Sequence, residues 1–258
     1  MISDSAARAF AEQLRDAEVD GTAAPLASDT FPDLDVGGAR AIARARDELR
    51  RSDGEVLIGY KLGWTSAAMR AALGIDRPNW GTLWQSQHLD GQLATATLRH
   101  AKVEPEIVYV ADAELSGTEV TSGDVISSGA GWAIGIEVVH PRWKSFDFTW
   151  LDNTADNSSS AAIAVGPKRQ IGVEPAALDV TFSDGADTQT GRGDLAMGDP
   201  AEAVAWLARQ LAREGLGIER GQIVFTGGLT APFDVSHGSR FTASCAELGD
   251  VAITTADS

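Results

Sequence analysis

The sequence is short of cysteine and of positive charge. Its one cysteine, Cys245, can neither form an internal disulfide nor build a cysteine-rich zinc site, which is typical of a protein kept in a reducing compartment. The 21 Lys and Arg residues stand against 37 Asp and Glu residues, so the net charge is −16. Because binding to nucleic-acid phosphates requires a surplus of cations, this composition excludes a nucleic-acid-binding protein of the ordinary basic-faced kind.

Long apolar runs are missing as well. No stretch approaches the roughly 20 apolar residues that a membrane span requires, and the first residues lack the basic and apolar regions of a signal peptide. We therefore expect a cytoplasmic protein with no membrane partner. With 43% hydrophobic and 22% charged residues, the chain can bury a full core, which predicts one large globular domain with a small helical annex.

Several motifs of enzyme active sites are absent from the sequence. It has no Walker A phosphate loop, no His-Glu-x-x-His zinc motif and no Gly-x-Ser-x-Gly nucleophile turn. The four histidines, which are His88, His100, His140 and His237, are scattered without the spacing of metal ligands. The remaining candidates for catalytic or metal-binding residues are carboxylates and lysine.

Apolar spacing predicts a few helices and many short strands. Helices are expected over 5–18, 38–51, 67–73 and 200–214. Short β-prone runs cover 55–62, 92–97, 103–110, 134–139, 161–165, 177–182, 222–226 and 240–244. Many strands with few crossover helices favour a mixed, β-rich α+β fold over a doubly wound sheet. We divide the chain into an N-terminal helical region at 1–80 and a β-rich catalytic domain at 81–258.

Two carboxylates lie two residues apart in one of these runs. Since side chains alternate along a strand, Glu104 and Glu106 project from the same face. Glu137 lies inside another apolar strand, where a charge is costly unless it is paired or bound to a metal. Three carboxylates without a Cys or His cluster favour Mg²⁺ or Mn²⁺ over zinc. The alternative is that the pair faces solvent on an edge strand, as Pro105 would suggest.

A lysine with nearby glycines is the second candidate. Lys61 lies in the β-like run between Gly59 and Gly63, where a ligand could approach the backbone closely. It could hold a substrate carboxylate or act as an acid/base, or it could be a surface lysine whose stem lies along the protein. The segment 152–160 is rich in turn-forming residues and small hydroxyls and by itself predicts only a polar loop.

Seven segments, in this order, make the sequence resemble the 2-keto-4-pentenoate hydratase and 4-oxalocrotonate decarboxylase family of the fumarylacetoacetate hydrolase superfamily. They are GYKLGWTS at 59–66, LGIDRPNWGTL at 73–83, VEPEIVYV at 103–110, IGIEVV at 134–139, DNTADNSS at 152–159, GRGDLAMGDPAEAVAWLARQL at 191–211 and GQIVFTGGLT at 221–230. The resemblance covers nearly the whole chain. It implies the superfamily's mixed β-sandwich roll behind an N-terminal helical region, and a homo-oligomer.

The resemblance also implies a site. In that family the acids matching Glu104, Glu106 and Glu137 bind Mg²⁺ or Mn²⁺. The lysine after Gly-Tyr corresponds to Lys61, and the small hydroxyl of the A-D-N-x-S segment corresponds to Ser159. We therefore expect Lys61 and Ser159 to be catalytic residues beside the metal ligands.

Two features depart from the family pattern. Hydratases of the family commonly carry Asp where this chain has Asn79, and an amide cannot act as a general base at neutral pH. Asn79 thus occupies a catalytic position with altered chemistry. Trp64, Trp80 and Trp84 are expected around the pocket, which would indicate a bulkier or aromatic substrate or a tighter core.

The activity implied by the resemblance is that of a lyase. A divalent metal chelated by the carboxylate and 2-oxygen of the substrate stabilises an enolate, and water addition to a 2-hydroxy-2,4-dienoate then gives a 4-hydroxy-2-oxo acid. One alternative is decarboxylation of a 4-oxalocrotonate-type 2-oxo diacid. Another is a catalytically altered relative with a bulkier substrate or a binding role.

Overall fold

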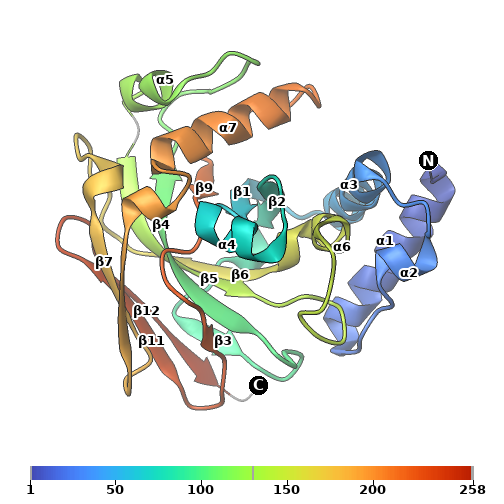
Figure 1. Cartoon of the computed structure of the whole chain (residues 1–258). Helices are drawn as coiled ribbons and strands as arrows, with labels where there is room; N and C mark the ends of the chain where they lie inside the picture. Colours follow the sequence, from blue (N-terminus) through green and yellow to red (C-terminus); the bar gives the residue numbers. More distant parts are fainter. Residues whose placement is uncertain (1, 130, 257–258) are drawn as a thin grey trace.

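The computed structural model describes residues 2–129 and 131–256. Helices near the N-terminus lie beside two curled β-sheets, as Figure 1 shows. This arrangement confirms the predicted α+β fold with an N-terminal helical region. Among the described residues, no helix combines the length and apolar character needed to cross a membrane.

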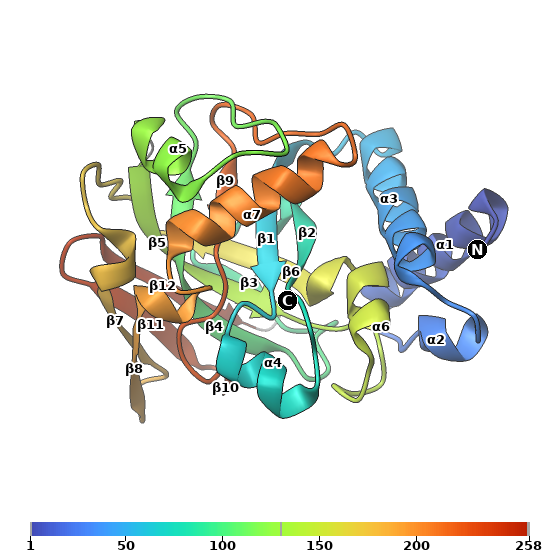
Figure 2. The ribbon, with the colours of Figure 1, turned by 45° about the horizontal axis from the view of Figure 1, so that its top comes forward.

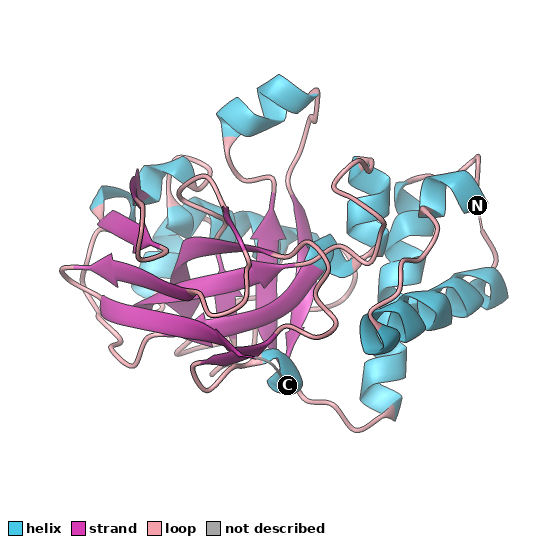
Figure 3. Cartoon of the chain, turned by 90° about the horizontal axis from the view of Figure 1, so that it is seen from below, coloured by secondary structure: helices cyan, strands magenta, loops and turns pink. Residues whose placement is uncertain are grey.

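Three helices make up the N-terminal region: α1 (Asp4–Asp20), α2 (Ala27–Thr30) and α3 (Val36–Ser52). The Ser3 hydroxyl accepts the Ala6 N–H at the start of α1, and Asp35 caps α3 in the same way through the Gly38 N–H. The apolar faces of α1 and α3 pack together and against Trp143 and Ala155 from later in the chain. Figure 3 shows these helices gathered at one side of the strands.

The larger sheet has the strand order β2-β1-β9-β4-β5-β6, and β10 also pairs with β4. Its strands are β1 (Leu57–Gly63), β2 (Asn79–Trp84), β4 (Lys102–Val110), β5 (Gly131–Val139), β6 (Ser160–Val165), β9 (Ile223–Phe225) and β10 (Phe233–Asp234). Strands β4 and β5 lie in the middle of the sheet, so residues on them are buried on both faces. Strand β1 of this sheet comes from the region before residue 80. The division of the chain into two regions at residue 80 stays a prediction.

The smaller sheet has the order β3-β12-β11-β7-β8. Its strands are β3 (Gln92–Ala94), β7 (Asp179–Ser183), β8 (Thr188–Arg192), β11 (Arg240–Cys245) and β12 (Gly249–Ala256). Apolar residues alternate along β11, with Phe241, Ala243 and Cys245 buried, which is the pattern of a strand with one covered face.

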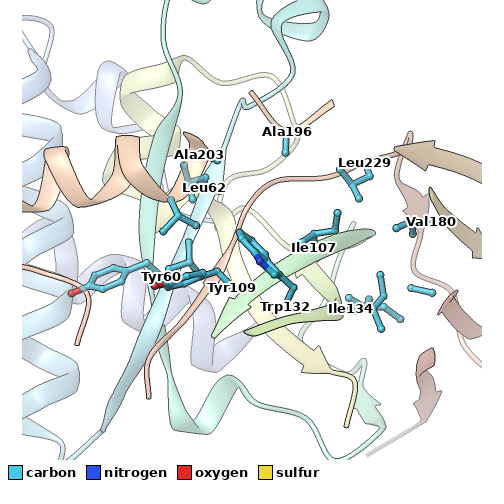
Figure 4. Close-up of a cluster of buried hydrophobic side chains, with 14 of the residues drawn as sticks. Tyr60, Leu62, Ile107, Tyr109, Trp132, Ile134, Val180, Ala196, Ala203 and Leu229 are labelled. Carbon is cyan, nitrogen blue, oxygen red and sulfur yellow. The ribbon is translucent and has the colours of Figure 1, made fainter. Parts of the chain in front are cut away.

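Four further helices connect or cover the strands: α4 (Ala67–Leu73), α5 (Ser122–Ser127), α6 (Trp150–Ala155) and α7 (Pro200–Ala212). Helix α7 lies across the larger sheet, as Figure 2 shows, and buries Val204, Leu207 and Leu211. The main core lies between this helix and the two sheets. Figure 4 shows part of it, including Tyr60, Ile107 and Trp132.

Candidate active site

The three predicted metal-binding acids come together on strands β4 and β5. Glu104 lies directly opposite Glu137 in the antiparallel register, and strand alternation places Glu106 on the same face as Glu104. One carboxylate oxygen from each of the three acids lies within 4.8 Å of the others. Glu106 and Glu137 are fully buried, and Glu104 is partly buried.

Pro105 does not mark an edge strand, so the solvent-facing alternative for the Glu pair is wrong. Strand β4 pairs with β5 on one side and with β10 and β9 on the other. Its ladder with β10 ends at Val103, and its ladder with β9 begins at Val108. Between the two, Pro105 needs no N–H donor, and its carbonyl accepts the Leu229 N–H.

Burial leaves the acids short of partners. It raises the pKa of Glu104 to about 7, and it raises the pKa of Glu106 well above its usual range, with the neighbouring Glu137 acting in the same direction. Among the described residues, Glu106 Oε1 and Glu137 Oε1 have no hydrogen-bond partner, and Glu137 Oε2 has only the Lys61 ammonium beside it. Buried acceptors without donors are costly, and an oxygen-binding divalent cation would satisfy all of them at once. The donor set therefore fits Mg²⁺ or Mn²⁺.

Lys61 lies beside these acids and is not a surface lysine. It is only 3% exposed, and its Nζ donates to the carbonyl and hydroxyl of Ser158 at 2.9 and 3.1 Å. The same Nζ lies 3.1 Å from Glu137 Oε2 and forms an ion pair with it. The ammonium thus lowers the pKa of Glu137, although burial raises that pKa more.

Ser158 owes its position to a left-handed turn at Asn157–Ser159. All three residues have positive φ, at 55°, 52° and 58°, a conformation that costs non-glycine residues roughly 1–2 kcal/mol each. The Asn157 amide holds the turn by exchanging hydrogen bonds with the backbone of Thr82. Gly81 allows the close approach, because a Cβ there would lie 2.4 Å from the Asn157 carbonyl oxygen.

Asn79 and Ser159 belong to a buried amide network beside Lys61. Asn79 Nδ2 donates to Asn153 Oδ1 at 2.7 Å, and Asn79 Oδ1 accepts the Ser158 hydroxyl at 3.0 Å. The Ser159 hydroxyl accepts from Asn153 Nδ2 at 2.8 Å. Neither Asn79 nor Ser159 lines the adjoining cavity, so their catalytic roles stay predictions.

The cavity beside these groups has a volume of about 320 Å³. Lys61, Glu104, Asn153 and Ser158 contribute its polar wall. The residue pattern did not single out Asn153 or Ser158, although both lie in the segment 152–160, which is rich in turn-forming residues and small hydroxyls. The composition of this segment indicated polar side chains. That Ser158 rather than Ser159 contacts Lys61 depends on the left-handed turn.

Only one of the three predicted tryptophans lines this cavity. Trp64 does so, and its indole N–H donates to Asn153 Oδ1 at 2.9 Å. Trp80 instead packs against Tyr60, with the Arg40 guanidinium 3.6 Å from its ring centroid. Trp84 is fully buried and donates to the Thr82 hydroxyl. Because successive side chains of β2 point to opposite faces, Asn79 and Trp80 cannot both face the site.

Comparison with known proteins gives full-length relatives. No protein-family model matches the chain. It is 35% identical to a 2-keto-4-pentenoate hydratase of Burkholderia vietnamiensis, over 98% of this chain and 99% of that one. It is 31% identical to a 4-oxalocrotonate decarboxylase of Pseudomonas sp. strain CF600, over 91% and 90% of the two chains. A solved structure of 4-oxalocrotonate decarboxylase from Pseudomonas putida G7, complexed with magnesium and adipate, superimposes with a TM-score of 0.94 over 99% of both chains at 28% identity.

Proposed function

The chain belongs to the 2-keto-4-pentenoate hydratase and 4-oxalocrotonate decarboxylase family of the fumarylacetoacetate hydrolase superfamily and is a lyase of that family, and we propose that it adds water to a 2-hydroxy-2,4-dienoate to give a 4-hydroxy-2-oxo acid. The observation that carries the proposal is a cluster of three carboxylates beside Lys61, two of them fully buried, with Lys61 and Glu104 lining the polar end of a cavity. Such a cluster destabilises a protein without a metal, because buried carboxylates repel one another, and it forms a binding site for a divalent metal.

Glu104, Glu106 and Glu137 are the residues that would hold Mg²⁺ or Mn²⁺. When bound, the ion supplies Lewis-acid stabilisation of the enolate that forms at the 2-oxygen of the substrate. The Gly227 N–H donates to Glu106 Oε2 at 2.6 Å and so fixes that carboxylate, leaving its other oxygen unpartnered. A solved relative of 28% identity was complexed with magnesium, which supports the same ion here.

Lys61 provides the cation that the substrate itself meets. Its ammonium lines the cavity, and two of its three donors are directed at Ser158 while the third side faces Glu137. Because Lys61 lines the cavity, its charge can balance the negative charge of the substrate, and its ammonium can exchange a proton with the dienolate. The Ser158 hydroxyl donates a hydrogen bond to Asn79 Oδ1, so its oxygen is free to accept from Lys61 Nζ.

Decarboxylation is the second candidate, and Asn79 is the observation that favours it. Hydration needs proton transfers that a carboxylate at position 79 would assist, whereas an amide cannot take up a proton at neutral pH. Both ends of the Asn79 amide are already engaged, with Asn153, Thr154 and Ser158. When a 2-oxo diacid loses its remote carboxylate as CO₂, the electron pair of the broken C–C bond moves through the conjugated C=C bond into the 2-oxo group and gives a dienolate, so this reaction requires no water.

The test is an assay with Mg²⁺ and two substrates, a 2-hydroxydienoate and a 2-oxo diacid with a remote carboxylate, followed by product identification by mass. We expect hydrated product from the first, and CO₂ release from the second would identify a decarboxylase. Activity should disappear with a chelator and return with Mg²⁺ or Mn²⁺. Full activity in excess chelator would overturn the metal assignment.

Glu106→Gln sharpens the test of the metal site, since an amide is a poorer ligand and lowers the negative charge of the site. We expect weaker Mg²⁺ binding by calorimetry, with Glu119→Gln, an exposed acid elsewhere, as the matched control. Unchanged affinity in Glu106→Gln would contradict the ligand set. A homo-oligomer is also expected from the family and is checked by light scattering.

A further inference from the structure

The cavity has two chemically different ends. Its polar residues Lys61 and Ser158 are 3% and 2% exposed, so they lie at the closed end. The apolar lining residues include Met69, Leu73 and Phe146, which are 41%, 58% and 37% exposed, so they surround the mouth. Phe148, Val139 and Pro232 add to this apolar wall. A ligand that reaches Lys61 must therefore pass or fill an apolar opening.

Helix α4 carries two of these mouth residues. Met69 and Leu73 are four residues apart and so share one side of the helix, and no residue of α4 is buried. The helix is nevertheless fixed in place, because the Arg70 guanidinium donates to the carbonyls of Trp64 and Thr65 at 2.6 and 2.9 Å. An anchored helix that directs a pair of large apolar side chains at a cavity mouth favours an apolar ligand group there.

The size of the cavity points the same way. An engineered apolar cavity of about 150 Å³ is large enough to bind benzene, and an unsubstituted pentadienoate is only slightly larger than benzene. The cavity of about 320 Å³ is roughly twice that volume. A pentadienoate held at Lys61 would therefore leave the apolar mouth unfilled.

Charge argues against a carboxylate in this outer part. Lys102 is the cation among the described lining residues near the mouth, and its Nζ already pairs with Asp234 Oδ1 at 2.5 Å. The same Nζ lies 5.4 Å from the ring centroid of Phe146. A second carboxylate on the substrate would compete with Asp234 for this one ammonium, and strand alternation places the acidic residue Glu104 on the same face as Lys102.

We propose that the substrate is a 2-hydroxydienoate with an apolar substituent, alkyl or aryl, on the end of the diene remote from its carboxylate. Met69, Leu73, Phe146 and Phe148 form the subsite that holds this substituent. The inference rests on the proposed function, because it places the carboxylate end of the substrate at Lys61 and the acid cluster.

The experiment compares kcat/KM of the Mg²⁺-loaded protein for three 2-hydroxydienoates whose far end carries hydrogen, a butyl or phenyl group, or a carboxylate. Burying a few CH₂ groups in a half-open subsite predicts a kcat/KM about tenfold or more higher for the apolar substituent than for hydrogen. Preference for hydrogen or carboxylate overturns the inference and leaves the proposed function standing. No turnover of any of the three overturns both.

Leu73→Lys tests the subsite directly by placing a cation at the mouth. Leu73 is 58% exposed, so this change is tolerated by the fold. We expect the ratio of kcat/KM for the apolar to the carboxylate substrate to fall by about tenfold or more, as a new ion pair forms and apolar contact is lost. Leu216→Lys, at an exposed leucine that does not line the cavity, is the matched control and should keep the wild-type ratio.

An unchanged ratio in Leu73→Lys would overturn the inference. If the oligomer size of the variant also changes, a second copy of the chain rather than substrate covers Met69 and Leu73. Light scattering of wild type and variant separates that outcome from the expected one.

Discussion

Lys61 illustrates how a single buried cation can be stable and reactive at once. Its ammonium is held by two oxygens of Ser158 and by the charge of Glu137, which together replace the water that burial removes. When all three acids around it are ionised, they carry more negative charge than it can neutralise. A divalent metal can neutralise this excess negative charge. Lys61 lines the cavity, so its charge can act on an anionic substrate there.

Lys61→Met should lower kcat by about 10²-fold or more while the protein still folds, because methionine keeps much of the packing of the stem but removes a preorganised charge. The measurement is steady-state kinetics at saturating Mg²⁺, with circular dichroism to check folding. Lys168→Met, which removes an exposed lysine, is the control and should keep wild-type turnover. Turnover of Lys61→Met within a few-fold of wild type would contradict a catalytic role.

The acid cluster should make metal binding depend on pH. Burial raises the pKa of Glu104 to about 7 and also raises those of Glu106 and Glu137, so protons compete with the metal below neutral pH. Relative to an unfolded-state pKa near 4.5, raised pKa values favour the folded metal-free protein at low pH. That stability is lost as pH rises toward and through 7. Metal restores it by pairing the ionised carboxylates.

We therefore expect the Mg²⁺-induced rise in Tm to be larger at pH 8 than at pH 5.5. Comparing each pH with and without Mg²⁺ removes the opposite contribution of His140, whose pKa burial lowers to about 3 and which therefore stabilises the fold as pH rises. Glu104→Gln should flatten the pH dependence. An equal or larger rise at pH 5.5 in wild type would contradict the role of these acids.

At the scale of elements, one buried arginine holds the strained turn. Arg142 donates through its backbone N–H and Nε to the Asp156 carboxylate, at 3.0 and 2.6 Å. Its two Nη atoms donate to the carbonyls of Asp156 and Ser160, which are the residues on either side of Asn157–Ser159. Both ends of the left-handed turn are thus tied to one side chain, and the position of Ser158 beside Lys61 depends on it.

Arg142→Met should lower the free energy of unfolding by about 3–5 kcal/mol, because it leaves the Asp156 carboxylate buried without its main partner. Arg46→Met is the matched comparison, since Arg46 contacts the same carboxylate at 3.3 Å but donates to neither carbonyl of the turn. We expect a smaller loss there. Urea unfolding measures both, and a second change, Asp156→Asn, should recover part of the loss in Arg142→Met.

An equal loss in the two single variants would contradict a special role of Arg142 at the turn. If Arg142→Met does not fold, the comparison moves to Arg142→Lys. That variant keeps one charge but loses the planar fork, and it should still be less stable than wild type.

At the scale of the whole molecule, the sequence predicts what depends on local patterns. Alternation and apolar spacing predicted most of the larger strands and the helices α1, α3, α4 and α7. The short helices α2, α5 and α6 have four to six residues, too few to show a helical period, and they were missed. Four strands, β2, β8, β10 and β12, were missed as well, although the buried residues of β12 alternate.

The site was predictable as a set of residue types but not as a geometry. The spacing of Glu104 and Glu106 predicted a shared face, which the structure shows. The contact of Lys61 with Ser158 rather than Ser159 could not be read from local pattern. It depends on three consecutive positive φ angles. Thr82 and Arg142 stabilise this turn, and both lie outside it in the sequence.

Long-range contacts of the same kind join α3 to strand β2 of the larger sheet and to segments next to α6 and α7. From α3, Arg46 pairs with Asp156 at 3.3 Å, and Asp47 accepts the Thr82 hydroxyl at 2.7 Å. Arg40 stacks on Trp80 and pairs with Glu214 at 2.9 Å. Each contact is largely buried, so separating the helices from the sheet would strand polar groups that water does not reach in the folded protein.

We therefore expect the helical region and the β-rich region to unfold in one cooperative transition rather than as two domains. Far-UV circular dichroism, which is dominated by helices, and tryptophan fluorescence, which reports Trp143 among the helices and Trp132 in the main core, should give coincident midpoints in urea. Arg40→Ala should lower both midpoints together, because its two partners lie outside the N-terminal helices. An earlier loss of the helical signal, in wild type or in the variant, would show that the residues before the first strand form a separate unit.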